Sequence, residues 1–202
     1  MEMPFLKRHL LLKDTISVAI FILCVFIGTI LINTFIFRSF SVVGPSMETT
    51  LYTNDRLIVN RIPVTIAQLQ NKTYTPKRGQ LIVFKNPKYD PNDGSDEYII
   101  KRVIAFAGER VVLKDGKYTV YNTSHPNGFN PDELVADETI GSPTSGSGDW
   151  TVPKSEIFVS GDHRQSSYSY DSRNGLGTIP LYDIIGPVEL RIYPFNKIRI
   201  FQ

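Results

Sequence analysis

An uncharged apolar run near the N-terminus limits what this chain can fold into more than any other feature. Ile16 to Phe37 reads ISVAIFILCVFIGTILINTFIF, and Asn33 is its most polar residue. A helix of this length rises about 33 Å, which is enough to cross a hydrocarbon layer of roughly 30 Å. No face of the helix would be polar, which disfavours a buried core helix. The run therefore predicts a transmembrane anchor over residues 15–37.

The charges that flank the run predict its orientation. Three cations precede it, at Lys7, Arg8 and Lys13. After it comes Arg38, and no further charge follows until Glu48. Because Lys and Arg favour the cytoplasmic side of a membrane, we expect residues 1–14 to be cytoplasmic. Residues 38–202 are then expected on the outer face of the cell membrane, held by a single-pass anchor.

A cleaved signal peptide is the competing interpretation of the run. The tripeptide Ser39-Phe40-Ser41 has the small-x-small pattern of a cleavage site. The apolar run is, however, longer than the apolar core of about 7–15 residues in an ordinary signal peptide. An uncleaved anchor is therefore the favoured interpretation.

The rest of the chain has the pattern of antiparallel β-sheets. Short strand-like runs recur without long helical periodicity, and at most one helical turn is expected, at residues 66–69. Asp115-Gly116 separates two alternating runs, which is a strong hairpin signal. The strand-like runs cover residues 56–62, 79–86, 97–108, 109–122, 156–161, 185–193 and 197–202. We therefore expect a mainly β domain after one N-terminal helix.

Between residues 122 and 149 the apolar content collapses. The stretch ends in GSPTSGSGD, which is typical of a flexible surface loop or an insertion. We therefore expect this region to be a loop and not a separate domain.

Composition excludes several classes of function. A net charge of +2 leaves no basic field for nucleic acid. Cys24 is the only cysteine, so an intramolecular disulfide cannot form. The histidines are scattered at His9, His125 and His163, and no spacing resembles a metal site. We expect neither a metal nor a cofactor.

A serine shortly after the anchor is a candidate nucleophile. It lies in SVVGPSMETTL, which spans Ser41 to Leu51, and a Gly-Pro pair there normally makes a turn with solvated side chains. A hydroxyl becomes a useful nucleophile only when a neighbouring base takes its proton. Ser46 is therefore of interest only if the chain also supplies such a base.

Two residues could supply it. His163 is the only histidine in a motif-like setting, but no Asp is marked to orient it, which disfavours a Ser-His-Asp triad. Lys101 lies in YIIKRVIA, where a strand would place it on one face with Ile99 and Val103. Arg102 would occupy the other face and is expected to be solvated.

A lysine acts as a base only when it is neutral. The pKa of a free lysine is about 10.4, so half-neutrality at pH 7 requires a lowering of about 3.4 units, and burial can lower a lysine pKa by about 3–5 units. A strand-edge lysine whose ammonium reaches water is the alternative interpretation of Lys101. The local pattern on its own favours this alternative.

Four stretches together carry a family resemblance. They are GPSMETTL (Gly44–Leu51), RGQLIVFKNP (Arg78–Pro87), IIKRVIAFAGE (Ile99–Glu109) and GDHRQSSYSYDSR (Gly161–Arg173). In this order after an anchor, the chain resembles the bacterial type I signal peptidases, in the single-anchor form typical of Gram-positive bacteria. The resemblance covers nearly the whole chain and includes the tail from Gly177 to Ile198.

The resemblance implies both a fold and an activity. The expected fold is an antiparallel β-sheet catalytic domain of the signal peptidase type. The expected activity is that of a membrane-bound serine endopeptidase, which removes N-terminal signal peptides from exported preproteins by cutting after a small residue. Expected partners are these signal peptides, membrane lipid, and protein translocation machinery or surface and pilus proteins, with no nucleic acid.

The resemblance also implies roles for residues. Ser46 matches the nucleophile and Lys101 the general base. The last box is two residues longer than usual, so the serine that hydrogen-bonds the base is either Ser167 or Ser169, and Ser169 is preferred. Ion-pair partners that hold the site together are expected at four further positions of that box: Asp162, Arg164, Asp171 and Arg173.

Two further implications concern the substrate. Shallow apolar pockets that select small residues at substrate positions −1 and −3 are expected from Phe40–Val43 and the strand that carries Lys101. Some relatives have a serine two residues before the nucleophile as an oxyanion donor. Gly44 stands there in this chain, so the second oxyanion donor is left open.

Two other functions remain as alternatives. A catalytically weak or inactive relative could act as an assembly factor or chaperone for surface proteins such as pilins. Such a protein would be expected to lose Ser46 or Lys101, and both are present. A self-cleaving regulator of the repressor type shares the Ser-Lys pair, but it predicts a DNA-binding head where this chain has an apolar anchor.

Overall fold

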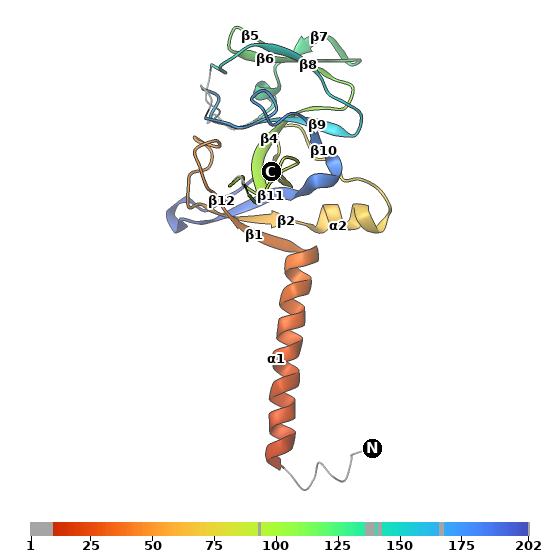
Figure 1. The fold of residues 1–202 in the computed structure, drawn as a ribbon, viewed down its shortest axis with the longest axis vertical. Helices are drawn as coiled ribbons and strands as arrows, with labels where there is room; N and C mark the ends of the chain where they lie inside the picture. The colour runs from red at the N-terminus through yellow and green to blue at the C-terminus, as the bar shows by residue number, and fades with distance from the viewer. Residues whose placement is uncertain (1–9, 93, 136–139, 141–142, 166–167, 202) are drawn as a thin grey trace.

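The computed structural model describes residues 10–92, 94–135, 140, 143–165 and 168–201. One long helix, α1 (Leu10–Phe35), extends away from a β-rich domain that contains every other described element (Figure 1). The predicted mainly β fold with one N-terminal helix is therefore confirmed.

The helix α1 matches the predicted anchor closely. Its segment Lys13–Phe35 is long and apolar enough to cross a membrane, and none of it is buried against the domain. The helix ends at Phe35, two residues before the predicted end of the anchor at Phe37. Phe37 instead opens β1 (Phe37–Ser41), because it pairs with Asn60 of the next strand. Lys7 and Arg8, which predict the orientation, lie outside the described residues.

The strands form two antiparallel sheets. The larger sheet has the order β1-β2-β11-β3-β4-β9-β10, and β12 also pairs with β11. The smaller sheet has the order β7-β6-β5-β8. The bounds in the larger sheet are β2 (Arg56–Asn60), β3 (Leu81–Lys85), β4 (Tyr98–Phe106), β9 (Glu156–Ser160), β10 (Ile179–Pro180), β11 (Ile184–Tyr193) and β12 (Arg199–Ile200). Those in the smaller sheet are β5 (Arg110–Lys114), β6 (Lys117–Asn122), β7 (His125–Phe129) and β8 (Gly148–Thr151).

Three apolar clusters form the core and enclose β4. One contains Val103 and packs between β3, β9 and β11. A second contains Met47 and Leu51, which follow the candidate nucleophile. A third contains Ile104 and joins β4 to the smaller sheet. The strand β4 is therefore covered on both faces, which decides the environment of its charged residues.

The predicted hairpin is confirmed, and one helix was missed. Asp115 and Gly116 connect β5 to β6, and both have positive φ angles (51° and 77°), as a two-residue hairpin turn of type I′ requires. The expectation of at most one helical turn at residues 66–69 is wrong, because α2 (Ile62–Leu69) has about two turns. Proline lies in its first turn, where no backbone donor is needed.

The region 122–149 is more ordered than predicted. It contains β7, a short 3-10 helix, η2 (Pro131–Leu134), and the start of β8. Phe129 packs on the third apolar cluster, and Pro131 and Thr144 are buried. The prediction of a plain surface loop is therefore wrong for these described parts, because a few apolar contacts suffice to add a strand at the edge of the smaller sheet. The remaining 3-10 turns are η3 (Leu181–Asp183) and η4 (Phe195–Lys197).

Candidate active site

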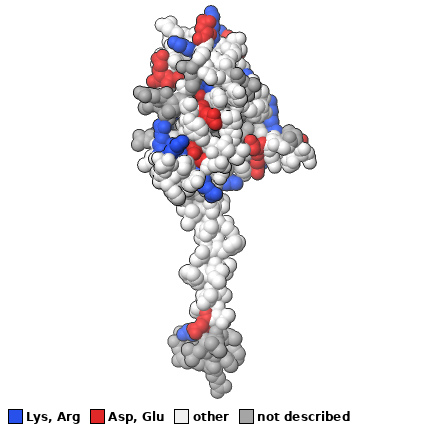
Figure 2. Space-filling model, turned by 90° about the vertical axis from the view of Figure 1, so that its left-hand side faces the viewer, with Lys and Arg blue, Asp and Glu red and all other residues white. Residues whose placement is uncertain are grey.

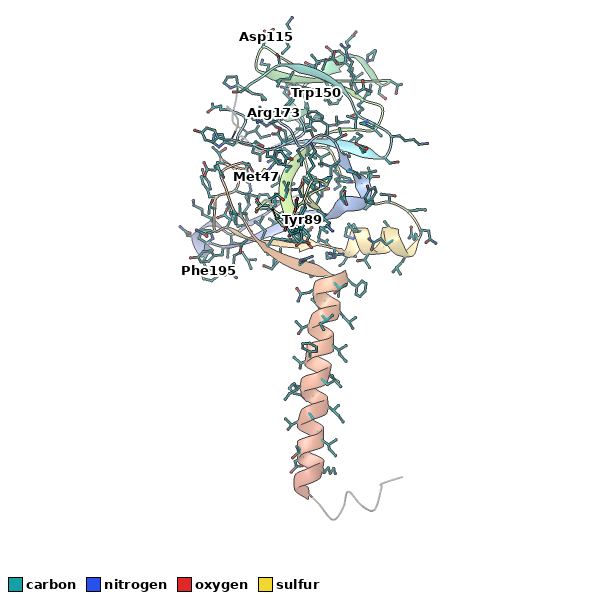
Figure 3. All side chains as sticks on the ribbon, viewed as in Figure 1. Met47, Tyr89, Asp115, Trp150, Arg173 and Phe195 are labelled. Carbon is teal, nitrogen blue, oxygen red and sulfur yellow. The ribbon has the colours of Figure 1, made fainter. Side chains whose placement is uncertain are left out.

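The candidate nucleophile lies in a tight turn directly after β1. Within this turn the Glu48 amide donates to the Pro45 carbonyl at 3.0 Å, and the Leu51 amide donates to the Met47 carbonyl at 2.8 Å. Met47 is 1% exposed and fixes the turn to the core. Figure 3 marks Met47 on the left flank of the domain, above the anchor helix and below Arg173. Ser46 directly precedes the buried Met47 and is itself half-buried.

The candidate base meets this serine from the middle of β4. The Lys101 Nζ lies 2.8 Å from the Ser46 Oγ, which is hydrogen-bond distance, and 2.9 Å from the Ile100 carbonyl oxygen. Lys101 is 3% exposed, so its amine does not reach water as the strand-edge alternative required. The structure therefore brings the two residues together in the arrangement that a Ser-Lys pair needs.

Burial changes the protonation of this lysine. Desolvation lowers the pKa of Lys101 to about 8, although the charges of Asp171, Asp162 and Asp96 act in the opposite direction. A pKa of about 7 would be needed for half of the Lys101 side chains to be neutral at pH 7, and the pKa of Lys101 stays above that value. About one-tenth of the molecules then carry a neutral Lys101 at pH 7.

The next residue in β4 corrects a prediction. Arg102 was expected to be solvated, but it is 3% exposed. Its Nε donates to Asp162 Oδ1 at 2.7 Å, and its Nη1 donates to the Gly79 carbonyl at 2.7 Å. Asp162 also accepts a hydrogen bond from the Thr50 hydroxyl at 2.6 Å. The alternation of residues along a strand predicts a solvated side chain only when one face of the sheet is exposed to solvent. Both faces of β4 are covered by apolar clusters.

The charged residues of the Gly161–Arg173 box form a buried network. Asp162 holds Arg102, as described above. Asp171 accepts from the Gly161 amide at 3.0 Å and pairs with Arg173 at 3.2 Å. Arg164 pairs with Asp132 of η2 at 2.7 Å. The four charged residues proposed as structural partners thus tie the box to β4, to itself and to the region 122–149.

The serine proposed to orient the base lies beside the site without bonding to it. Ser169 is fully buried, and its Oγ has no hydrogen-bond partner among the described residues. A Cβ on Gly161 would lie 2.2 Å from the Ser169 Oγ and 2.3 Å from the Ser46 carbonyl oxygen. Both oxygens therefore lie against the same side of Gly161, where no side chain fits. The other candidate, Ser167, lies outside the described residues.

His163, which the sequence analysis disfavours as a base, contacts the nucleophile turn. Its backbone amide donates to the Ser46 carbonyl at 3.1 Å, and its ring Nδ1 lies 3.1 Å from the Pro45 carbonyl oxygen. The ring also stacks on Tyr168, with ring centroids 4.6 Å apart. Its place inside the Gly161–Arg173 box was the only signal for this contact.

A second buried ion pair fixes the far end of the turn. Arg191 of β11 donates to Asp55 at 3.0 Å and to the Thr50 carbonyl at 3.0 Å. Arg191 stands in an apolar strand pattern, which was the available signal, but its partner is 136 residues away in the sequence. Only the folded sheet reveals this pair.

A groove runs past the Ser46 hydroxyl. It has a volume of about 430 Å³, and one wall is formed by residues 40–47 and the other by residues 96–101. Tyr168 and Tyr170, from the extended box, also line it. The strand β1 is an edge strand of the larger sheet, so the groove begins at a free sheet edge. These walls are the segments expected to form the substrate pockets.

The chemistry of the site is that of acyl transfer. A hydroxyl next to a buried amine can attack a carbonyl carbon, and the Ser46 amide is available in the turn as an oxyanion donor. Gly44 has a positive φ of 86° and offers no side chain to the oxyanion. Within the described parts of the chain, no cluster of His, Cys, Asp and Glu side chains could hold a metal ion.

Comparisons with known proteins identify the family. A family model described as "Signal peptidase, peptidase S26" matches residues 12–193. The chain is 31% identical to signal peptidase I P of Bacillus subtilis subsp. natto over 88% of this chain and 89% of that relative. It is 32% identical to signal peptidase I T of Bacillus subtilis strain 168 over 84% and 81%. A crystal structure of a signal peptidase I from Enterococcus faecalis V583 matches at 22% identity and a TM-score of 0.42, over 57% of this chain and 98% of that chain. Since the family model spans most of the sequence, the chain belongs to the signal peptidase family, peptidase S26.

Proposed function

We propose that this chain is a membrane-anchored serine endopeptidase that removes N-terminal signal peptides from exported preproteins, with Ser46 as nucleophile and Lys101 as general base. Membership of the signal peptidase family supports the reaction and the substrate class. The observation that carries the residue roles is the distance of 2.8 Å between the Ser46 Oγ and a lysine amine that is 3% exposed.

The mechanism follows from this pair. Neutral Lys101 takes the Ser46 proton while the Oγ attacks the scissile carbonyl carbon, and the new C–O bond gives a tetrahedral oxyanion near the Ser46 amide. The resulting ammonium returns the proton to the leaving amine as the peptide bond breaks. Water then attacks the acyl-enzyme, again with Lys101 as base, and releases the acid and free Ser46.

Ser169 is proposed as a positioning residue for the base. Its hydroxyl is buried beside the Ser46 carbonyl and lacks a partner among the described residues. A buried hydroxyl without a hydrogen-bond partner costs free energy. A function in another state of the site would explain why the chain keeps it. Protonated Lys101 can use a further acceptor, and the Ser169 hydroxyl, which lies on the same side of Gly161 as the Ser46 carbonyl, is proposed to provide it.

The groove is proposed to hold the substrate in extended form. The free edge of β1 can pair with the peptide backbone by strand addition, while the apolar walls between residues 40–43 and 97–101 accept small side chains at positions −1 and −3. Cleavage after a small residue is the specificity that membership of the signal peptidase family supports.

The proposed topology places the site next to the membrane. Residues 1–14 lie in the cytoplasm, residues 15–37 form the single-pass anchor, and residues 38–202 form the catalytic domain on the outer face. The cations around the run support this orientation. Translocation machinery that delivers preproteins, and surface or pilus proteins among its substrates, are the proposed partners.

An assembly factor without catalysis is not favoured. That role does not need a serine within hydrogen-bond distance of a buried lysine, and the chain keeps both. Burial of the Lys101 amine costs free energy, and a role without catalysis gives no reason for that cost.

Cleavage of a fluorogenic signal-peptide substrate tests the proposal. The full chain in detergent should cut after a small residue, and Ser46→Ala and Lys101→Ala should each abolish cleavage while their unfolding remains cooperative. A matched control is Lys114→Ala, which removes an exposed lysine from β5. An inactive parent chain, or an active Ser46→Ala variant, would contradict the proposal.

A further inference from the structure

Two tyrosines of the extended Gly161–Arg173 box face the groove. Tyr168 and Tyr170 are 59% and 42% exposed, and both line the groove that runs past Ser46. Ser169, which lies between them, is fully buried. The segment therefore turns one side toward the core and presents both rings on the other side. The extended box thus brings aromatic surface to the active site.

Each ring is supported by the protein. Tyr168 stacks on His163, with ring centroids 4.6 Å apart and an angle of 23° between the planes. Tyr170 lies over Gly175, where a Cβ would come within 3.3 Å of the ring edge. Because the rings are already packed in place, a ligand that binds to them does not have to order them first.

The tyrosines lie at the nucleophile end of the groove. At one end the rings of Phe40 and Tyr98 face each other, with centroids 5.4 Å apart. At the other end the Ser46 Oγ meets the Lys101 amine. The Tyr168 ring stacks on the histidine whose backbone amide donates to the Ser46 carbonyl. The aromatic surface therefore belongs to the Ser46 end and not to the Phe40 end.

The proposed function sets the direction of the substrate along this groove. Positions −1 and −3 are proposed to occupy the walls between residues 40–43 and 97–101, on the Phe40 side of the scissile bond. The first residues of the released chain, at positions +1 and +2, then leave the groove at the end where the two tyrosines lie.

We propose that Tyr168 and Tyr170 form a subsite for an aromatic side chain at position +1 or +2 of the preprotein. The preferred substrates are then exported preproteins whose mature chain begins with an aromatic residue within its first two positions. The inference rests on the proposed function, because that function supplies the direction of the bound peptide.

The chemistry of the subsite favours a ring over a cation. Two partly exposed rings can pair with a third ring in offset or edge-to-face geometry. Lys88 donates a hydrogen bond to the carbonyl of Gly175, the glycine under the Tyr170 ring, and Lys101 stands at the same end of the groove. These two positive charges repel a Lys or Arg side chain of the substrate.

The surrounding surface does not attract charge of either sign. Figure 2 shows the flank of the domain that carries the nucleophile turn. Lys and Arg side chains there are interspersed with Asp and Glu on a mostly uncharged surface. The described part of this flank therefore has no field of one sign that would select a charged segment.

Cleavage of three matched peptides tests the subsite. The peptides share one signal-peptide sequence with Ala at positions −1 and −3, and they carry Phe-Phe, Ala-Ala or Lys-Lys at positions +1 and +2. For the full chain in detergent, kcat/KM should be about tenfold higher for the Phe-Phe peptide than for the Ala-Ala peptide. The Lys-Lys peptide should be cut no faster than the Ala-Ala peptide.

Variants of the two tyrosines should change this preference. Tyr168→Ala with Tyr170→Ala should bring the Phe-Phe and Ala-Ala peptides to similar values of kcat/KM. Tyr168→Phe with Tyr170→Phe should keep the preference, because the ring faces and not the hydroxyls make the contact. Tyr182→Ala is the matched control and should change nothing, since Tyr182 is 78% exposed in η3 and does not line the groove.

The ratio of the two rates separates specificity from structural support. Tyr168 also supports His163, so loss of its ring should slow cleavage of both peptides. A purely structural role would slow both equally and leave their ratio unchanged, and this result would overturn the proposal. A parent chain that cuts the Lys-Lys peptide fastest would also overturn it, because the rings would then serve a cation.

A binding measurement keeps the test independent of catalysis. The Ser46→Ala chain is titrated with the same peptides, each labelled with a fluorophore at its N-terminus, and anisotropy gives the Kd. The Phe-Phe peptide should bind about tenfold more tightly than the Ala-Ala peptide, and the double Tyr→Ala change should remove this difference. Equal affinities would overturn the subsite. A parent chain that cuts none of the peptides would contradict the proposed function, but the affinities would still decide the subsite.

Discussion

The Lys101 Nζ and the Ser46 Oγ are 2.8 Å apart, although 55 residues separate them in the sequence. Two buried ion pairs hold this distance. Arg102 and Asp162 fix β4 to the start of the Gly161–Arg173 box and to the nucleophile turn, and Arg191 fixes the far end of that turn. The two buried ion pairs therefore position the reacting atoms, in addition to the hydrogen bond between the atoms themselves. Catalysis by a preorganised site needs such positioning.

The pH dependence of cleavage should follow the protonation of Lys101. Only the neutral amine can take the Ser46 proton, and burial lowers the pKa of Lys101 to about 8. The value of kcat/KM for a soluble peptide should therefore rise about tenfold per pH unit below pH 8 and level off above it. A profile that is flat between about pH 6 and pH 8 would exclude Lys101 as the base.

The same burial should make Lys101 costly for stability. Its pKa is about 8 in the folded chain and has an ordinary value of 10.5, so the folded state carries an unfavourable buried charge below pH 8. This penalty fades as the pH rises from 8 to 10.5, because only the folded state has then lost the proton. Lys101→Met should therefore raise the free energy of unfolding at pH 7 by about 2 kcal/mol, and less at pH 10.

Denaturant unfolding at the two pH values measures this gain. Lys114→Met, at an exposed position of β5, is the control and should show no such difference. A Lys101→Met chain that is less stable than the parent at pH 7 would mean that the buried amine contributes more through its hydrogen bonds than it costs by desolvation.

Asp162 should be among the most sensitive positions for stability. It is fully buried and pairs with Arg102, so Asp162→Ala leaves an uncompensated buried guanidinium and should lower the free energy of unfolding by about 3–5 kcal/mol. Asp149 pairs with Arg110 on the surface, where both side chains are half exposed. Asp149→Ala should therefore have little measurable effect in the same denaturant titration. Similar losses for the two variants would contradict the role given to the buried pair.

Ser169→Ala should separate activity from stability. The hydroxyl has no partner among the described residues, so its removal should leave the free energy of unfolding unchanged or slightly raised. Cleavage should still fall about tenfold, because protonated Lys101 loses an acceptor. Ser172 of the same box accepts a hydrogen bond from the Val159 amide, so Ser172→Ala should instead lower stability. Full activity of Ser169→Ala would leave Ser169 a packing residue.

The sequence was informative where a pattern is local and silent where partners are distant. The anchor, the Asp115-Gly116 hairpin and most strands follow from periodicity and turn residues. The burial of Arg102 does not follow from these patterns. Alternation predicts burial only if one face of the strand is exposed to solvent, and β4 has apolar clusters on both faces. Similarly, the pairing of Arg191 with Asp55 depends on the sheet order, which no local pattern encodes.

Some local signals were also too weak to interpret. The helix α2 is eight residues long and packs on the domain through Val64. Such a short segment contains too few apolar residues to show a helical period in the sequence. In the region 122–149, a polar composition hid β7, which needs only the packing of Phe129 to join the smaller sheet. Short elements of this kind are fixed by tertiary contacts and not by propensity.

His163 should act as a positioning residue for the oxyanion donor. The Pro45–Ser46 peptide carries the Ser46 amide at one end and the Pro45 carbonyl at the other, and these point in opposite directions in a trans peptide. The His163 Nδ1 and the Glu48 amide both lie at hydrogen-bond distance from that carbonyl oxygen, at 3.1 Å and 3.0 Å. They therefore hold the peptide plane that sets the direction of the Ser46 amide, which is the proposed oxyanion donor.

The split between kcat and KM tests this role. His163→Ala should lower kcat about tenfold with little change in KM or in stability, because the donor is misdirected only when the oxyanion forms. His163→Asn should restore most of the rate, since its amide can donate to the same carbonyl. His125, on the exposed strand β7, offers the matched control, and His125→Ala should have no effect. A rise in KM at constant kcat would show that His163 acts on substrate binding through the groove and not on the oxyanion.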